Sequence, residues 1–382
     1  MNADYDVIVV GAGIVGAACA FECARDGMRV AVVEGAAVGG GATAAGMGHI
    51  VVMDDSPAQL ALTRYSQMLW RELATELPAS AEYDTIGTIW IAADDEEMQE
   101  VARKCAVYRQ YDVPAEILNA EALRKVEPNL NPALAGGLLV PRDAVLNASR
   151  VAVHLLDQAV QRSAELVNKT AMAIGNGRVD LHDGSMLAGT RIVNATGADA
   201  SDLTPGLPIR KRKGHLAIAD SCPGYVSHQL VELGYLKGAG SIAGDSIAFN
   251  VQPRRNSQML IGSSRQYDAE GSEVEAAILH RMMDRARQYL PGVDKLSLLR
   301  SWTGFRSATP DKLPLIGPYP DDPTIFLATG HEGLGITTAL ATARLLVDHF
   351  AGRNSEIPSG PYLPSRMRFD TIEKKARSTN GL

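Results

Sequence analysis

Near its N-terminus the chain reads DVIVVGAGIVG, residues 6–16. The β-branched run at the start of this stretch predicts a short strand that is buried on both faces of a parallel sheet. A helix is expected from about Ile14 to Arg25, followed by a second buried strand over residues 29–33 that Glu34 closes. Strand, glycine-rich turn, helix, strand and acidic residue are the βαβ pattern of dinucleotide-binding proteins. The alternative is a glycine-rich βα turn without a ligand.

Each glycine of this turn has its own physical task. Gly11 permits the tight turn, Gly13 lets the backbone approach a pyrophosphate, and Gly16 lets helix and strand pack closely. The helix opens at Ile14 and Val15, where free N–H groups and the helix dipole favour a phosphate. An acidic residue after the second strand accepts hydrogen bonds from ribose hydroxyls. The stretch therefore predicts dinucleotide binding.

Composition limits the remaining choices. A chain of 382 residues is long for one core and predicts two domains. The net charge of −7 argues against nucleic acid as a partner. The longest apolar stretch, residues 7–24, is interrupted by glycines and Glu22, so no transmembrane segment is expected. Four cysteines without metal-ligand spacing and a chain start without a basic leader predict a cytoplasmic protein with no metal site. Cys19 and Cys23 are expected to be small core residues rather than a redox pair.

The chain alternates between two kinds of sequence composition. Glycine- and alanine-rich βα sequence fills residues 1–85, 140–206 and 305–367, whereas residues 86–139 and 207–304 are richer in strands and polar turns. A nucleotide domain assembled from three separate segments favours FAD over a nicotinamide cofactor. We expect an α/β fold: a Rossmann-like FAD-binding domain of the glutathione reductase type, and a second, α+β substrate domain built on an antiparallel sheet. Residues 368–382 are expected to form a surface tail. The elements expected are strands at 85–92, 191–195 and 324–328, a hairpin at 179–187, and helices at 95–110, 148–161 and 336–350.

Several motifs in fixed order make the resemblance specific. The chain resembles the D-amino-acid oxidase/dehydrogenase family of flavoproteins, which includes glycine oxidase and sarcosine oxidase. Within it, the chain looks most like the β subunits of D-hydroxyproline dehydrogenase, opine oxidase, archaeal L-proline dehydrogenase and hydrogen cyanide synthase complexes. The motifs that carry the resemblance are GAGIVG at 11–16, GGGATAAG at 39–46, GMGH at 46–49, NATG at 194–197, WTGFR at 302–306, TPD at 309–311, PLIG at 314–317 and GHEGLGITT at 330–338.

The resemblance implies one non-covalent FAD and names the segments that would hold it. Backbone N–H groups of the glycine-rich loop suit the pyrophosphate or ribityl chain. The loop that precedes the last helix would point its N-terminus at the pyrimidine edge of the flavin and stabilise negative charge there. The cofactor-binding residues so expected are Gly11, Gly13, Ile14, Val15, Gly16, Glu34, Gly41, Ala42, Thr43, Gly46, Met47, Ala171, Thr196, Gly197, Gly304, Arg306, Gly330, Gly333, Leu334, Gly335 and Ile336.

Four residues are candidates for contact with the substrate. Arg306 matches the family arginine that binds the substrate carboxylate, since a guanidinium offers a planar pair of donors; a surface ion pair is the alternative. His49 and His331 lie in predicted cofactor-lining segments and are either chemical or structural hydrogen-bonding residues. Asn250 replaces a tyrosine that several members carry. No dedicated base is needed, because a neutral amine can give hydride directly to flavin N5.

Departures from the simple oxidases leave the substrate and the electron acceptor open. Gly333 stands where glycine oxidases carry a second arginine, and no cysteine follows Cys222 that could link a flavin. The basic run at 210–213 is expected to be a solvated turn, or alternatively a contact for a partner subunit or for an FMN at a subunit interface. We expect dehydrogenation of an amino or imino acid, D-hydroxyproline first, with electrons passing to partner subunits. The alternatives are a self-sufficient oxidase, a non-catalytic flavin-bound subunit and, most remotely, a nicotinamide-dependent dehydrogenase.

Overall fold

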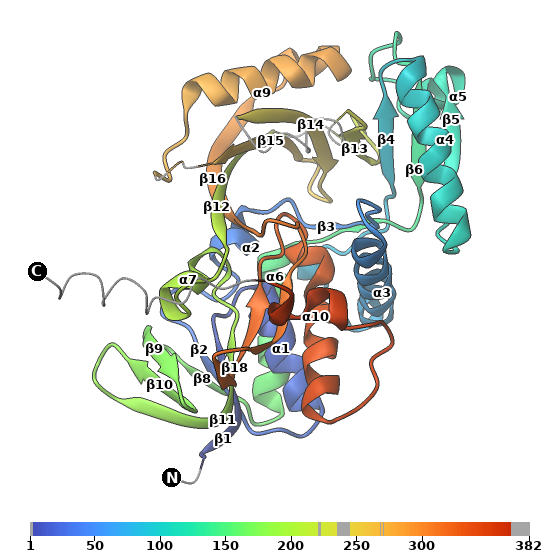
Figure 1. The fold of residues 1–382 in the computed structure, drawn as a ribbon. Helices are drawn as coiled ribbons and strands as arrows, with labels where there is room; N and C mark the ends of the chain where they lie inside the picture. Colours follow the sequence, from blue (N-terminus) through green and yellow to red (C-terminus); the bar gives the residue numbers. More distant parts are fainter. Residues whose placement is uncertain (1–2, 221–222, 235–244, 268, 270, 368–382) are drawn as a thin grey trace, which may run out of the picture.

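The computed structural model describes residues 3–220, 223–234, 245–267, 269 and 271–367. Within them the strands form two eight-stranded sheets and one two-stranded ladder. Figure 1 shows a lower layer of sheet and helices, and an upper sheet that curves over it. We call these the lower sheet and the upper sheet. The ladder, β3 (His49–Ile50) with β7 (Ala144–Val145), lies where the two layers meet.

The lower sheet is the expected dinucleotide-binding sheet. Its strand order is β17-β18-β11-β1-β2-β8, and neighbours from β18 to β8 run parallel. The hairpin of β9 and β10 continues from β11 by antiparallel pairing. The strands are β1 (Tyr5–Val10), β2 (Val30–Val33), β8 (Glu165–Val167), β9 (Ala171–Gly175), β10 (Arg178–Leu181), β11 (Met186–Asn194), β17 (Leu315–Tyr319) and β18 (Asp322–Thr329).

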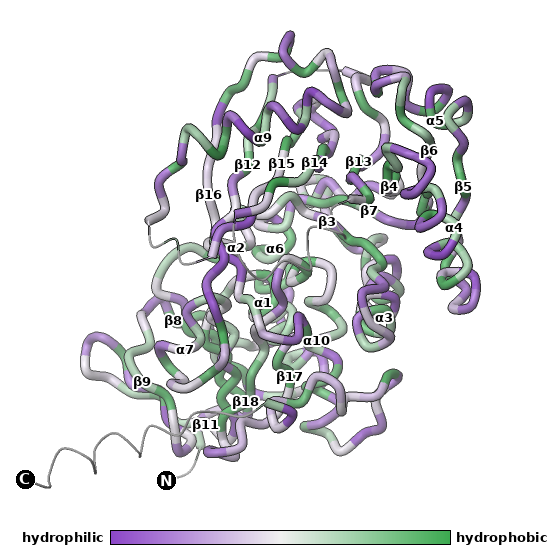
Figure 2. Tube along the Cα trace, turned by 45° about the horizontal axis from the view of Figure 1, so that its top comes forward, coloured by the Kyte–Doolittle hydropathy of each residue, from purple (hydrophilic) through white to green (hydrophobic). Residues whose placement is uncertain are grey.

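Both faces of β1 and β2 are buried, which explains their apolar runs at 7–10 and 30–33. Val7 and Val9 face the helices, whereas Ile8 and Val10 face the β9–β10 hairpin. In Figure 2 the tube of β11 and β18 is largely green, as expected of such strands. The helices of this layer are α1 (Ile14–Arg25), α2 (Gly41–Ala45), α3 (Pro57–Leu73), α6 (Ala148–Gln161), α7 (Ala200–Leu203) and α10 (Gly335–Phe350).

The upper sheet has the order β16-β12-β15-β14-β13-β4-β6-β5. Its neighbours are antiparallel except for β13 and β4, which run parallel, so the prediction of an antiparallel sheet was wrong at that one pair. Helix α9 covers its outer face through Phe249 and Tyr289, whose rings stack at 4.7 Å. The elements are β4 (Thr88–Ala92), β5 (Glu116–Asn119), β6 (Gly136–Val140), β12 (Arg210–Ala219), β13 (Gln229–Glu232), β14 (Ser246–Pro253), β15 (Met259–Tyr267), β16 (Leu298–Ala308), α4 (Asp95–Gln110), α5 (Ala120–Val126) and α9 (Ala276–Tyr289).

Chain segments contribute to the two sheets in an interleaved way. The lower sheet takes strands from the beginning, the middle and the end of the chain, and the upper sheet takes the strands between them. Strand β16 spans the predicted boundary at residue 305 and continues past it to Ala308. The domain limits themselves stay a prediction. The predicted tail at 368–382 and Cys222 lie outside the described residues.

Local predictions agree with the structure where the sequence pattern is strong. The α/β fold is confirmed, and α1, α4 and α6 begin and end where the periodicity placed them. The predicted hairpin turns at Gly184, whose φ of +82° favours glycine. The strand predicted from residue 85 begins only at Thr88, because Gly87 has a φ of +73°. Cys19 and Cys23 are free thiols in the core, as expected.

The basic run was wrongly predicted as a solvated turn. Residues 210–213 are the first four of β12. Arg212 and Lys213 are only 5% and 2% exposed, and Lys213 Nζ lies 2.9 Å from Glu275 Oε1. Arg212 and Lys213 are therefore occupied inside the protein, whereas Arg210 and Lys211 are exposed, so a contact of the run with an FMN phosphate or a partner stays a prediction. No helix of the described residues is long and apolar enough to cross a membrane.

Candidate active site

The glycine turn at the end of β1 is packed as the sequence predicted. Gly11 has a φ of +99°, and a Cβ there would lie 2.7 Å from Ala195 O at the end of β11. A Cβ at Gly16 would lie 1.9 Å from Gly11 O, so only glycine lets α1 approach the turn. Gly13 precedes α1 in an extended conformation, with no side-chain cap. The turn thus leaves the start of α1 to a ligand.

The glycine-rich loop after β2 folds against this turn. Gly39 N donates to Ala12 O at 2.8 Å, and Ile14 N donates to the hydroxyl of Thr43 at 3.0 Å. Ala42 and Gly41 are exposed, and Gly41, with a φ of +55°, has no atom within 4 Å of a built Cβ. The loop therefore lies beside the N-terminus of α1, and its contact with a pyrophosphate stays a prediction.

Glu34 holds the turn as well as facing the nucleotide side. Its Oε2 accepts from Ala12 N at 2.7 Å and its Oε1 from Ala36 N at 2.9 Å. Next to it, Gly35 lies against Thr170, one residue before Ala171 at the start of β9. Ala171 is thus close to the acidic residue, as an adenine neighbour should be. Its contact with adenine, and that of Glu34 with ribose, stay predictions.

The ends of three parallel strands meet at the same edge of the lower sheet. Gly11 follows β1, Thr196 and Gly197 follow β11, and Thr329 ends β18. Thr329 Oγ1 donates to Gly197 O at 2.8 Å, and Gly197 has a φ of +63° with open space around it. In doubly wound folds, this carboxyl edge is where the cofactor binds.

The start of α10 reaches the same place from the far end of the chain. The loop before it turns at Gly330, with a φ of +76°, and no side chain caps the helix. A Cβ at Gly335 would lie 3.8 Å from Val15 of α1, and a Cβ at Gly46 would lie 2.8 Å from Ile336. Two helix N-termini therefore converge, and both favour negative charge, although Ile14 N of α1 already donates to the Thr43 hydroxyl.

The upper sheet closes over this point through contacts that leave no room for larger residues. A Cβ at Gly304 of β16 would lie 2.3 Å from Ala45 of α2. The Sδ of Met47 packs against Gly262 of β15, and Trp302 Nε1 donates to Ala45 O at 3.3 Å. Leu334 is half-buried between the layers. The segments predicted to line the cofactor are thus brought together at one junction.

Arg306 lies on the inner face of the upper sheet, beside the loop that leads into α10. Its Nη1 donates to Ser264 O at 3.0 Å, and its guanidinium packs on Gly214. A Cβ at Gly333 would lie 3.5 Å from Arg306 Nε. Burial and the charge of Arg212 lower the pKa of Arg306 to about 9, so it stays cationic at neutral pH. It is a half-buried cation beside the loop that leads into α10.

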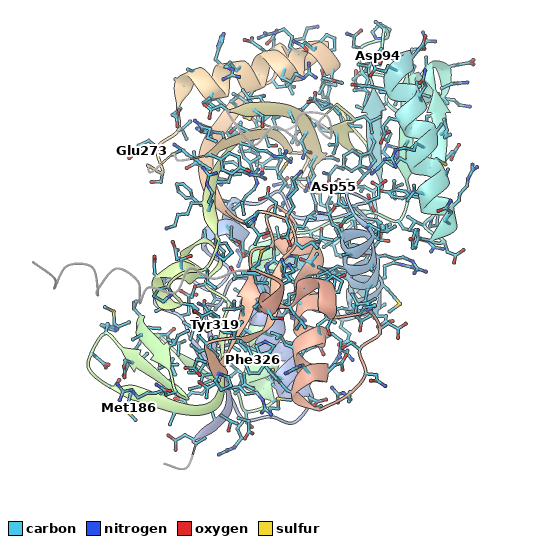
Figure 3. The ribbon with its side chains drawn as sticks, viewed as in Figure 1. Asp55, Asp94, Met186, Glu273, Tyr319 and Phe326 are labelled. Carbon is cyan, nitrogen blue, oxygen red and sulfur yellow. The ribbon has the colours of Figure 1, made fainter. Side chains whose placement is uncertain are left out.

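Sequence reasoning missed two further arginines. Arg212 stands opposite Arg306 in the pairing of β12 with β16 and forms an ion pair with Glu332. Burial and the charges of Arg212 and Arg306 lower the pKa of Arg265, while Asp55 opposes this shift; Figure 3 shows Asp55 between the two layers. Reading residues 210–219 as one strand would have placed Arg212 and Gly214 on the same face. Three arginines thus lie near one another on this face, and one of them, Arg212, is already paired with Glu332.

His331 does not point its imidazole at an open site. The residue is 6% exposed, and its Nε2 lies 3.0 Å from Thr342 Oγ1 of α10. Burial lowers the pKa of His331 to about 3, so the ring is neutral at physiological pH. This environment favours a structural role that fixes the loop on α10, and a direct chemical role stays a prediction.

Acidification should reveal the buried His331. Because its pKa is about 3 when folded and about 6.5 when unfolded, the unfolded chain binds the extra proton below pH 6.5, and stability falls as the pH drops. The contribution lost between pH 7 and pH 5 is about 2 kcal/mol. The free energy of unfolding in urea is measured at both pH values for the wild type and for His331→Gln. Between pH 7 and pH 5 it should fall by about 2 kcal/mol less in His331→Gln than in the wild type. An equal loss in both proteins would contradict the assignment.

His49 and Asn250 meet through a residue that the sequence did not single out. Gln229 Nε2 lies 2.9 Å from His49 Nδ1 and donates to Asn250 Oδ1 at 3.3 Å. Burial lowers the pKa of His49 to about 3. An amide nitrogen only donates, so the imidazole accepts from it and carries no charge. His49 and Asn250 are thus parts of a neutral polar cluster rather than of an acid–base pair.

The residues fit FAD by their own geometry. Gly41 and Gly197 both combine a positive φ with open space, and the starts of α1 and α10 lie close together at the carboxyl edge of the sheet. Such a cradle suits a long ligand with phosphates at one end and an acceptor of hydrogen bonds at the other. No group of three or more potential metal ligands occurs among the described side chains.

Comparison with known proteins agrees with this geometry. The family model "FAD dependent oxidoreductase" matches residues 6–349. Glycine oxidase of Geobacillus kaustophilus is 26% identical over 96% of this chain and 98% of its own, and hydrogen cyanide synthase subunit HcnC of Pseudomonas aeruginosa is 26% identical over 96% and 97%. The crystal structure of the Geobacillus glycine oxidase superposes with a TM-score of 0.85 at 26% identity, covering 95% of this chain and 99% of that one. L-proline dehydrogenase from P. horikoshii gives 0.85 at 21% identity over 96% and 98%. The chain therefore belongs to the family of FAD-dependent oxidoreductases.

Proposed function

We propose that this protein dehydrogenates the C–N bond of an amino or imino acid. One observation carries the proposal: Arg306 presents a half-buried guanidinium beside Gly333, in the loop that opens α10. A carboxylate bound there would lie next to the helix N-terminus that faces the predicted flavin. Relatives named glycine oxidase and L-proline dehydrogenase act on such acids, which supports the same substrate class here.

Each part of the protein has a definable task in this reaction. FAD, when bound, accepts a hydride at its N5 and supplies the oxidising chemistry. Arg306 binds the carboxylate in a planar, two-point contact and so orients the Cα–H bond. The N-terminus of α10 stabilises negative charge near the loop at 330–335. His49 is neutral and the amine enters neutral, so no side chain has to remove a proton.

Among substrates, a cyclic or N-substituted amino acid is the best candidate, and D-hydroxyproline comes first. The support is the resemblance of residues 46–49 and 330–338, together with Asn250 and Gly333 in place of a tyrosine and an arginine. We also propose that electrons pass to partner subunits, because one relative is itself a subunit of hydrogen cyanide synthase. An FMN at a subunit interface belongs to the same proposal, and within the basic run Arg210 and Lys211 are the exposed residues that would meet its phosphate.

An anaerobic screen tests the reaction. The FAD-loaded protein is mixed with D-hydroxyproline, D- and L-proline, sarcosine and glycine, and flavin absorbance near 450 nm is followed. Bleaching by an amino or imino acid supports the proposal, and the absence of bleaching by any acid would favour a non-catalytic subunit. Air is then admitted: slow reoxidation supports a partner acceptor, whereas rapid stoichiometric peroxide favours the self-sufficient oxidase that the glycine oxidase relatives suggest.

The flavin should be FAD and non-covalent. No cysteine follows Cys222, so the linkage through a cysteine near residue 309 has no attachment point. Acid precipitation of the purified protein should release all yellow colour into the supernatant, where it migrates with FAD on chromatography. Flavin that stays in the washed pellet would show a covalent bond and contradict the prediction.

A further inference from the structure

We infer that three neutral amides on the inner face of the upper sheet, together with the neighbouring His49 of β3, form a subsite for an uncharged hydrogen-bonding group of the substrate, such as a hydroxyl. They are His49, Gln229, Asn250 and Gln252, and we call them the amide cluster. The inference rests on the proposed function. It adds that the substrate carries, besides its carboxylate, an uncharged group that forms hydrogen bonds.

The placement of the cluster follows from strand register. Asn250 and Gln252 are alternate residues of β14 and face the same side, while Phe249 and Val251 face α9. Asn250 pairs with Gly262, against which Met47 packs from the lower layer. The amide cluster therefore faces the junction where the cofactor segments converge.

Buried amide atoms in the cluster lack partners. Gln229 is 1% exposed and Gln252 is 0% exposed. Within the part of the chain that the structure describes, Gln229 Oε1 and both amide atoms of Gln252 lack a partner with full hydrogen-bond geometry, although a side-chain contact of Gln252 with His49 acts to raise the pKa of that imidazole. Leaving a buried polar atom unpaired costs about 1–3 kcal/mol, so atoms of this kind are normally satisfied by a ligand or a bound water.

The cluster also adjoins a cavity. A cavity of about 170 Å³ is lined by Gln252 together with Pro253, Val145, Leu146, Ile86 and Val226. The charged residues at its wall are paired with each other, Arg254 with Glu82 and Arg255 with Asp84. Gln252 is the one member of the amide cluster that lines this cavity, and the four charged residues of its wall form two ion pairs.

Charge separates this subsite from the one for the carboxylate. Arg306, Arg212 and Arg265 lie on β16, β12 and β15, whereas the amides lie on β13 and β14. His49 is the titratable member, and it is held neutral by burial with a pKa of about 3. A second carboxylate would find no cation in the amide cluster, and an alkyl group would leave the amides unpaired. A hydroxyl or carboxamide can both donate to and accept from them.

The test compares substrates that differ by one hydroxyl. The kcat/KM of FAD-loaded protein is measured for 4-hydroxy-D-proline and D-proline, and for D-serine and D-alanine. In at least one pair the hydroxylated member should be favoured by about 10- to 100-fold, because the analogue leaves the amides unpaired. In Gln252→Met and Gln229→Met this preference should fall below about threefold, mainly by loss on the hydroxylated substrate.

A matched control removes another buried glutamine of the same sheet. Gln266 of β15 is 5% exposed and bonds Glu275 away from the amide cluster, so Gln266→Met should keep the wild-type preference. Equal kcat/KM within both pairs, or a preference unchanged in Gln252→Met and Gln229→Met, would overturn the subsite. Both results leave the proposed function standing, since flavin reduction still occurs. Failure of every acid to bleach the flavin would instead refute the proposed function.

Discussion

Gly16→Ala is expected to abolish FAD binding and to destabilise the lower layer. A Cβ at this position would lie 1.9 Å from Gly11 O and 3.0 Å from Gly11 C, which are backbone atoms of the phosphate-facing turn. Neither can move without displacing α1 from β1 or opening the turn beside Ala195. The cost of such overpacking is about 1–3 kcal/mol or more. Because the cofactor itself stabilises the fold, loss of binding adds to the effect.

Equilibrium dialysis and thermal unfolding measure both consequences. The affinity for FAD should fall at least 100-fold, and the apoprotein should unfold at a lower temperature. Gly27→Ala is the control at the other end of α1, because its Cβ would meet no atom within 4 Å. With a φ of +82° it should lose about 1–2 kcal/mol of stability and keep its FAD. Normal FAD affinity in Gly16→Ala would contradict the assigned role of the turn.

Arg306→Lys is expected to lose catalysis while it retains FAD. Lysine keeps the positive charge but offers no planar pair of donors, so the substrate carboxylate would be bound without a fixed orientation. The ammonium group of the introduced lysine would also be repelled by the positive charge of Arg212, which already lowers the pKa of Arg306. A charge-assisted hydrogen bond contributes about 1.5–3 kcal/mol, so kcat/KM should fall by about one to two decades.

Stopped-flow flavin reduction against substrate concentration checks this prediction. The flavin content should match that of the wild type, because the contacts at α1 and α10 are untouched. Arg300→Lys on the same strand is the control, since Arg300 is exposed and packs over Trp302. Its kinetics should not change. If Arg306→Lys kept full activity with bound flavin, another group would have to anchor the carboxylate.

The sequence by itself determined the dinucleotide-binding half of this fold. The glycine turn at 11–16, helix α1 and the hairpin at Gly184 depend on residues close together in the chain, so their local pattern was enough to predict them. Helix α10 and its glycine-rich start were also predicted, because the apolar repeat and the preceding glycines mark a helix N-terminus. The sequence also placed Arg306 next to these segments, through a motif rather than through geometry.

Only the tertiary structure decided what lines the inner face of the upper sheet. A strand presents alternate residues to opposite faces, and a shift by one residue would exchange them. The pairing of β12 with β16 brings Arg212 opposite Arg306, and that of β13 with β14 brings Gln229 near Asn250. Lys213 is likewise buried because β12 continues through the basic run. These pairs join segments 20 to 100 residues apart, and His49 meets Gln229 across 180 residues. Local periodicity carries no information about such contacts, because the register of distant strands is set when the whole sheet assembles.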